Sequence, residues 1–357
     1  MRDALAERLL AKVMEWSPEE VATERRILQG MALFKYDEYQ KYSPGRRFVE
    51  SLAIWLQQFA SIEDRRIAYQ FVRSRLVYFS TSEIVHLAGV AFPDVIRPML
   101  IEEVAKILTV PNFQVRKIVS DKEYQHALRQ CLYLGLSDGA RTDIFRRSTS
   151  EVNHEQMLST YEVTNKKASG MLAWMNKGFE KDEQRKFRYL FLMDDFSASG
   201  RSYLRKEDSG EFGGKVFKVF QDINKNQLEG LVDPNTLTIT ILLYVATDQA
   251  IQQLSALCDE ALVDKPYNCC VKACQRLEDV MKLDSGKDSE FWKLLEKYYD
   301  ASIETEHTGC VKYGYADCAL PIVLSHNTPN NSVYLLWAES DKVKPLFPRV
   351  SRHKRET

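Results

Sequence analysis

Apolar side chains recur every three to four residues through the first third of the chain, which is the spacing of one face of a helix. The clearest such face carries Leu52, Trp55, Leu56 and Phe59. Residues 65–79 and 99–108 repeat the pattern, and Gly45 and Pro93 mark turns between helices. The spacing predicts a helical domain over residues 1–120, with almost no strand in it.

The pattern changes after residue 120 to short apolar runs separated by turn residues. The runs predicted as strands are residues 132–136, 160–163, 188–193, 236–247, 319–325 and 332–338. Helical spacing returns in residues 166–179 and 251–261. Strands alternating with helices are typical of βαβ units, so we expect a Rossmann-like α/β domain with a mostly parallel sheet over residues 121–357.

Composition narrows the class of protein. The 357 residues are 45% apolar and 28% charged, with a formal net charge of −1, so any nucleic-acid contact would need a local basic patch. Residues 1–16 lack the apolar core of a signal peptide, and no stretch approaches eighteen uncharged apolar residues. The seven cysteines, an odd number, predict reduced thiols. We therefore expect a cytoplasmic protein without a membrane span.

The run YLFLMDDFSASGRS, residues 189–202, carries the strongest chemical signal. An apolar strand is expected to end at Met193, followed by two adjacent carboxylates, Asp194 and Asp195. The residues beyond are mostly small: Ser197, Ala198, Ser199, Gly200, Arg201 and Ser202. A loop of small residues leaves backbone N–H groups open to phosphate oxygens, while carboxylates accept hydrogen bonds from ribose hydroxyls or bind Mg²⁺. The alternative is an acidic strand end with a solvated turn.

This stretch resembles the phosphoribosyl-diphosphate motif of the type I phosphoribosyltransferases, with Ser199 where the family usually has Thr. The resemblance implies a phosphorylated ribose as ligand, with Asp194 and Asp195 at the ribose and at Mg²⁺, and residues 197–202 at the 5-phosphate. It also implies an earlier pyrophosphate loop, for which Ser137, Asp138, Gly139 and the catalytic candidate Arg141 are the matching residues. A plain turn is the alternative for that loop, and solvent exposure is the alternative for Arg146 and Arg147.

Two departures from the family pattern bear on turnover. No mobile lid is recognisable in residues 150–188, and the helix expected after the phosphate loop is interrupted by RKEDSGEFGG, residues 205–214. The C-terminal region, expected to form a hood over the acceptor, matches no base-salvage hood. In it His326 and Asn327 either form part of a turn or face the acceptor, where a histidine suits general acid–base work.

Three further groups of residues, the cysteines, the tryptophans and the basic tail, each have a structural interpretation as well as a functional one. Cys269, Cys270 and Cys274 lack paired CxxC spacing and a nearby His, which favours buried thiols over zinc ligands. Trp55, Trp292 and Trp337 are expected in the core rather than as stacking platforms. The basic tail is either a frayed end or a nucleic-acid or partner contact, and its charged residues are Arg349, Arg352, His353, Lys354 and Arg355.

LSDGAR, MDDFSASG, HNTPNN and PLFPR behind a helical N-terminal part together resemble a phosphoribosyltransferase-like family of predicted effectors in bacterial conflict and anti-phage loci, some beside retron reverse transcriptases. That resemblance implies either glycosyl transfer or hydrolysis at a nucleotide site, or a site that only senses a nucleotide. It also implies a protein or RNA partner in a defence complex.

Overall fold

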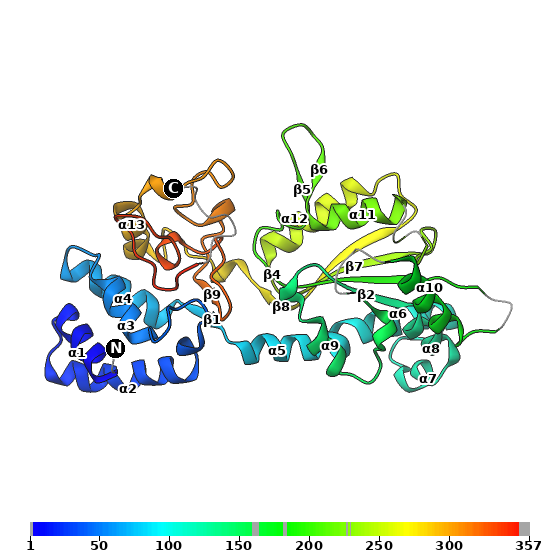
Figure 1. Ribbon diagram of the computed structural model, residues 1–357, viewed down its shortest axis with the longest axis horizontal. Helices are drawn as coiled ribbons and strands as arrows, with labels where there is room; N and C mark the ends of the chain where they lie inside the picture. Colours follow the sequence, from blue (N-terminus) through cyan, green and yellow to red (C-terminus); the bar gives the residue numbers. More distant parts are fainter. Residues whose placement is uncertain (1–2, 159–163, 181–183, 226–227, 229, 350–357) are drawn as a thin grey trace. The chain divides into compact units, whose positions relative to one another are not determined.

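The computed structural model describes residues 3–158, 164–180, 184–225, 228 and 230–349. The chain divides into two compact units, drawn in Figure 1: Met1–Glu83 with Asp279–Thr357, here called unit 1, and Ile84–Glu278, here called unit 2. The predicted division at residue 120 falls inside unit 2, and the segment predicted as a hood shares unit 1 with the N-terminal helices. The strand predicted at residues 160–163 lies outside the described residues.

Unit 1 is mainly helical. Its helices are α1 (Asp3–Met14), α2 (Pro18–Phe34), α3 (Phe48–Leu56), α4 (Ile62–Ser74) and α13 (Ser289–Lys297). A capping box begins α2, where the Ser17 hydroxyl accepts from the Glu20 N–H. Trp55 is fully buried and donates its indole N–H to the Leu335 carbonyl at 2.8 Å, so it is a core residue as predicted.

The C-terminal segment packs into the same core. Phe347 of PLFPR is buried, and its ring contacts the rings of Tyr36, Tyr39 and Phe48. Two short strands join the ends of the unit, β1 (Val77–Phe79) pairing in parallel with β9 (Ile322–Leu324). The strand β1 corrects the prediction of helix through residue 79.

One predicted strand of unit 1 is wrong. SVYLLWA, residues 332–338, forms a short 3₁₀ turn, η8 (Tyr334–Leu336), whose side chains are all buried. Its unbroken apolar run reflects burial from every side within a packed turn. An apolar run of this length does not distinguish a strand from other buried backbone.

Unit 2 is built on a parallel five-stranded sheet, as predicted. The strands are β2 (Cys131–Gly135), β3 (Met157–Leu158), β4 (Tyr189–Ser197), β7 (Thr238–Thr247) and β8 (Asn268–Leu277), in the order β3-β2-β4-β7-β8. Helices cover both faces of the sheet: α11 (Lys215–Lys225) and α12 (Asp248–Ala261) lie on one face and α9 (Thr142–Arg147) on the other (Figure 1). The fold is therefore the α/β class that the sequence predicted, with β8 as a strand that the sequence did not reveal.

The remaining helices of unit 2 are α6 (Arg97–Leu108), α7 (Val115–Val119), α8 (Lys122–Arg129) and α10 (Asn165–Asn176). Pro93 does not end a helix as predicted, because α5 (Thr81–Val90) runs through a π-helical segment, Ala91–Ile96, directly into α6. The π geometry accommodates a proline without a break.

The run Thr81–Leu108 has the length and composition of a membrane span. A core helix of a soluble protein passes the same test, and 33% of the most apolar window is buried. Ile84, Ala88, Phe92, Ile96 and Leu100 are all buried and recur every four residues, so one face of the run packs inside the protein.

Candidate functional site

The predicted site residues of unit 2 meet where the sheet changes direction. From β2 the chain moves outward to β3 on one side and then returns to β4 on the other side. Ligands of open parallel sheets bind beyond the carboxyl ends of the strands at this topological switch point. The loop after β2, residues 137–141, and the acid pair of β4 both lie there, as the sequence predicted.

Strand β4 does not end at Met193 as expected. β2 stops pairing with it at Gly135 and Met193, but β7 continues beside it as far as Ser197 and Ala246. The acid pair therefore lies within a strand, just past the end of its shorter neighbour. Because successive strand residues face opposite sides, Asp194 points to the face of α11 and Asp195 to the face of α9.

Asp194 is 1% exposed, and both of its oxygens are engaged. Oδ1 accepts from the Ser137 hydroxyl, in a short contact, and from the Asp195 N–H at 3.1 Å; Oδ2 accepts from the Lys215 ammonium at 3.0 Å. Burial first, and then the adjacent Asp195 carboxylate, raise the pKa of Asp194, while Lys215 and Ser137 act to lower it. The contact with the ammonium stabilises the ionised form against these two effects.

Asp195 lies against the loop after β2. A Cβ placed on Gly139 would come within 2.6–2.7 Å of the three carboxyl atoms of Asp195, so only glycine fits there without a shift. Tyr244 of β7 donates its hydroxyl to the Ala140 carbonyl and so holds this loop in place. Burial and the nearby carboxylates of Asp195 and Asp194 are among the causes that raise the pKa of Tyr244.

Arg141 ends this loop in a left-handed conformation, with φ 44° and ψ 45°. That conformation is unusual for a residue with a side chain, and such strain concentrates at functional sites. The Arg141 Nε is buried and donates no hydrogen bond to any described residue. A guanidinium placed in this way suits an anion next to the loop.

In the loop after β4, several carbonyls form hydrogen bonds with described residues, whereas several N–H groups do not. The carbonyls of Ala198, Gly200 and Ser202 all accept hydrogen bonds from the protein. Within the described part of the chain, the N–H groups of Ala198, Ser199, Gly200 and Ser202 donate none. The Ser197 hydroxyl is also buried without a hydrogen-bond partner there. Inward carbonyls and unused amides are the arrangement of an anion-binding nest.

Helix α12 supports this loop from behind. The Thr247 hydroxyl donates to the Ala198 carbonyl and accepts from the Ala250 N–H at 3.0 Å, so it caps the helix and fastens the loop together. Gly200 has φ +75°, and a Cβ there would lie 2.9 Å from Leu254 and 3.3 Å from the Ala250 carbonyl. Glycine is therefore required both by the turn and by the close approach of the helix.

The charged insertion after the loop is a hairpin, β5 (Arg205–Lys206) with β6 (Phe212–Gly213), instead of an unstructured interruption. The chain returns to where it left, because the Lys215 N–H bonds the Ser202 carbonyl at 3.3 Å and the Val216 N–H bonds the Tyr203 carbonyl at 2.8 Å. Helix α11 thus begins beside the loop after β4, as the family pattern implies. Its first residue is Lys215.

Several other predicted residues lie outside the loops and strand ends of unit 2 described above. His326 and Asn327 belong to unit 1, where Leu324 and Asn327 exchange backbone hydrogen bonds at 3.0 and 3.2 Å in a tight turn after β9. Arg146 and Arg147 end helix α9 on partly and fully exposed positions. Of the basic tail, only Arg349 is described; Arg352, His353, Lys354 and Arg355 lie outside the described residues.

The sequence did not reveal Lys215, Tyr244 and Thr247 as residues of the site. A polar Thr followed by Asp at the end of an apolar strand is the signature of a helix N-cap and could have indicated Thr247. Nothing local distinguishes Tyr244 from other strand residues. Lys215 follows two glycines at the start of an amphipathic helix, but only the returning hairpin brings it to Asp194.

The donor set fits Mg²⁺ only together with a ligand. Among the described residues, no group of three or more His, Cys, Asp or Glu side chains could hold a metal ion. Asp194 accepts three hydrogen bonds, one of them from the Lys215 ammonium, so a metal ion there would compete with Lys215 for the carboxylate. One carboxylate with substrate phosphates is a common way to bind Mg²⁺.

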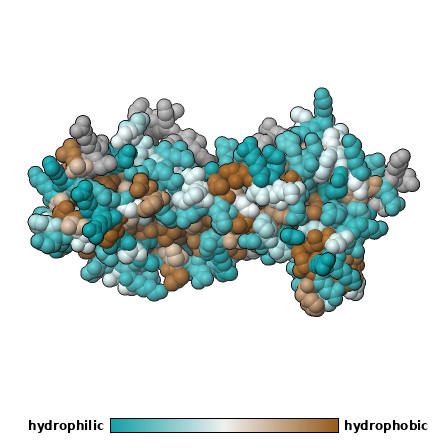
Figure 2. All heavy atoms as spheres, turned by 90° about the horizontal axis from the view of Figure 1, so that it is seen from below, coloured by the Kyte–Doolittle hydropathy of each residue, from teal (hydrophilic) through white to brown (hydrophobic). Residues whose placement is uncertain are grey.

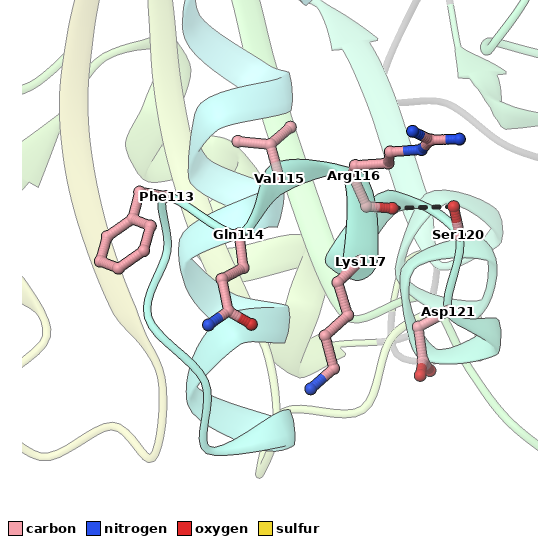
Figure 3. A pocket seen from close by; sticks show the side chains of 7 residues that line it. All are labelled: Phe113, Gln114, Val115, Arg116, Lys117, Ser120 and Asp121. Carbon is pink, nitrogen blue, oxygen red and sulfur yellow. Dashed lines mark hydrogen bonds between the residues drawn. The ribbon is translucent and has the colours of Figure 1, made fainter.

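A separate surface depression of about 630 Å³ lies over the start of α7 (Figure 3). It is lined by residues 113–117 with Ser120 and Asp121, and shares no residue with the site at the strand ends. In Figure 3 the Phe113 ring and the Arg116 side chain point to opposite sides of it. Phe113 is 77% exposed. Figure 2 shows for one face that apolar side chains lie among polar ones at the surface.

Comparison with known proteins identified a family. The sequence model of the family PRTase-CE, a phosphoribosyltransferase-like family, matches residues 52–349. This range includes the strands and loops of the site in unit 2, the β9 turn and most of unit 1. Neither the curated proteins nor the solved structures gave a match.

Proposed function

The chain belongs to the phosphoribosyltransferase-like PRTase-CE family, and from this premise we propose that unit 2 binds a phosphorylated ribose, phosphoribosyl diphosphate or a related nucleotide, at the carboxyl ends of β2 and β4. The 5-phosphate binds in the loop Ser197–Ser202. Asp195 accepts hydrogen bonds from ribose hydroxyls, and the loop Ser137–Arg141 faces the pyrophosphate.

The observation that carries this proposal is the orientation of the loop after β4. Three of its carbonyls accept hydrogen bonds from the protein and at least four of its amides are unused by described residues, with the buried Ser197 hydroxyl beside them. A phosphate brings several acceptor oxygens that such a group of donors can bind together. A solvated acidic turn, the alternative, has no reason to bury a hydroxyl that donates and accepts nothing.

In the transfer reaction the bond between C1 of the ribose and the pyrophosphate oxygen breaks, pyrophosphate leaves with the electron pair, and the acceptor, or water in hydrolysis, bonds to C1. Positive charge develops on the sugar ring as the first bond breaks. Asp195 lies where a carboxylate can orient the ribose, and Arg141 neutralises negative charge on the departing pyrophosphate. Asp194 does not contact the ligand, because its oxygens accept hydrogen bonds from Ser137 and Lys215. It holds these two side chains in place. Mg²⁺, held by Asp195 and the ligand, would supply further neutralisation of the pyrophosphate.

Isothermal titration of the whole protein with phosphoribosyl diphosphate, with Mg²⁺ and then with EDTA, tests the proposal. We expect saturable binding that weakens when Mg²⁺ is removed, and a loss of at least about tenfold in affinity for Asp195→Asn, as for a lost charged hydrogen bond. Asp208→Asn in the exposed hairpin is the matched control and should bind as the unaltered protein. Absence of binding to any phosphorylated ribose would contradict the proposal.

A site that binds without turnover is the second candidate, favoured by the burial of the acid pair, with Asp194 1% and Asp195 7% exposed. Under this candidate the protein is a nucleotide sensor in a bacterial defence complex with a protein or RNA partner; under the first it is a defence effector acting by glycosyl transfer or hydrolysis. Pyrophosphate release measured across a panel of bases and nucleosides separates the two. Binding without release supports the sensor.

A further inference from the structure

We propose that Lys215 is a ligand-binding residue of this site, whose ammonium is held by Asp194 and contacts the phosphate bound in the loop Ser197–Ser202. The inference rests on the function proposed above. It gives the two adjacent acids different tasks: Asp195 serves the sugar, and Asp194 positions a cation for the phosphate.

The backbone of Lys215 is fixed next to the loop. Its N–H bonds the carbonyl of Ser202, the last loop residue, at 3.3 Å, and the next hydrogen bond joins Val216 to Tyr203 at 2.8 Å. Gly214 makes this approach possible, because it has φ +112° and a Cβ there would lie 2.4 Å from the Tyr203 carbonyl oxygen. The start of α11 is therefore locked to the end of the loop.

The side chain of Lys215 runs from the loop toward the acid pair. Its Nζ lies 3.0 Å from Asp194 Oδ2 and 5.1 Å from the centroid of the Tyr203 ring. The Lys215 side chain is 27% exposed, whereas that of Asp194 is 1% exposed. The ammonium is thus the accessible end of the ion pair, and the carboxylate is the enclosed end.

The chemistry of this pair suits an anion. An ammonium has three donors, and Asp194 accepts from only one of them. Two carboxylates near a phosphate would repel it, so a cation between them and the loop reduces that repulsion. Lysine commonly binds phosphate as a point charge on a flexible stem. Asp194 restrains this stem and places the charge.

A double-mutant cycle separates this role from simple charge neutralisation. Affinity for ribose 5-phosphate is measured by titration for the unaltered protein, Lys215→Met, Asp194→Asn and the double variant. In the Asp194→Asn background the carboxylate that pairs with Lys215 is gone, so any further effect of Lys215→Met on affinity reports contact between the ammonium and the ligand. Thermal denaturation of all four proteins shows that each is folded before its affinity is compared.

We expect the double variant to bind ribose 5-phosphate at least about tenfold more weakly than Asp194→Asn, the loss typical of one charge-assisted hydrogen bond. Lys215→Arg should retain affinity within about threefold, because it keeps the charge. Equal affinities of the double variant and Asp194→Asn would overturn the inference and leave Lys215 as a counter-ion only. If the unaltered protein binds neither ribose 5-phosphate nor phosphoribosyl diphosphate, the proposed function itself fails, and this inference with it.

Discussion

Gly139→Ala is the sharpest single test of how the loop after β2 packs against Asp195 of strand β4. The added Cβ would lie 2.6 Å from Cγ and 2.7 Å from each carboxylate oxygen of Asp195. Ordinary contacts begin at 3.4 Å, so the loop or the carboxylate must move by about 0.8 Å. The atoms that collide belong to the end of a short side chain, which can turn away.

The fold should therefore suffer less than the function. Turning Asp195 or lifting the partly exposed loop costs about 1 kcal/mol, near the low end for added volume, and lowers the melting temperature by about 2–4 °C. A displacement of this size at a site that requires precise geometry costs about 10- to 100-fold in ligand affinity. Differential scanning fluorimetry and titration with phosphoribosyl diphosphate measure the two effects on the same protein.

Gly170→Ala in α10 is the matched control, since no atom lies within 4 Å of the added Cβ. We expect it to leave affinity unchanged and to stabilise the helix by up to about 1 kcal/mol. Gly139→Ala that binds and melts as the unaltered protein does would refute the close packing of the β2 loop on Asp195, and with it the geometry on which the site is built.

Three other outcomes follow from the structure. Gly214→Ala should lower the melting temperature clearly, since the added Cβ would lie 2.4–2.7 Å from the carbonyl oxygen and carbon of Tyr203. Gly210→Ala, also at positive φ but in open space, should cost only the backbone strain of about 1 kcal/mol. Equal effects of the two substitutions would contradict the close contact between Gly214 and Tyr203. Burial raises the pKa of Asp194, so the folded state binds the carboxyl proton more tightly than the unfolded state. The contribution of Asp194 to the free energy of unfolding therefore falls as pH rises above about 4. Asp194→Asn should remove this fall from a plot of the free energy of unfolding against pH. Thiol reagents should modify the exposed Cys310 of the native protein long before the buried Cys131, whose pKa burial raises to about 12; rapid modification of Cys131 would contradict its burial in β2.

The strands β4 and β7 show what local pattern can predict. Both are apolar, rich in strand-forming residues and bounded by turn signals, so their existence follows from the sequence. β8 was missed because its sequence, NCCVKACQRL, mixes small, charged and polar residues. It is an edge strand with partly exposed faces, and such strands carry no continuous apolar signal.

The division of the chain was beyond the same kind of reasoning. Helical periodicity continues from unit 1 through α5 and α6 of unit 2, so no change of texture marks Glu83. The C-terminal segment joins the N-terminal helices because Phe347 and the 3₁₀ turn η8 fill their core. Which distant segments share a core depends on three-dimensional packing, which one-dimensional periodicity does not record.

The sequence by itself determined that the protein has a parallel α/β sheet and that paired acids precede a loop of small residues, because strand propensity and the chemistry of side chains are local properties. Only the tertiary structure decided that β4 continues through the acids and turns them to opposite faces, since strand length and facing are set by pairing with β7. It also decided that Lys215, Tyr244 and Thr247 meet there, because the contacts that bring them together join residues up to 104 positions apart.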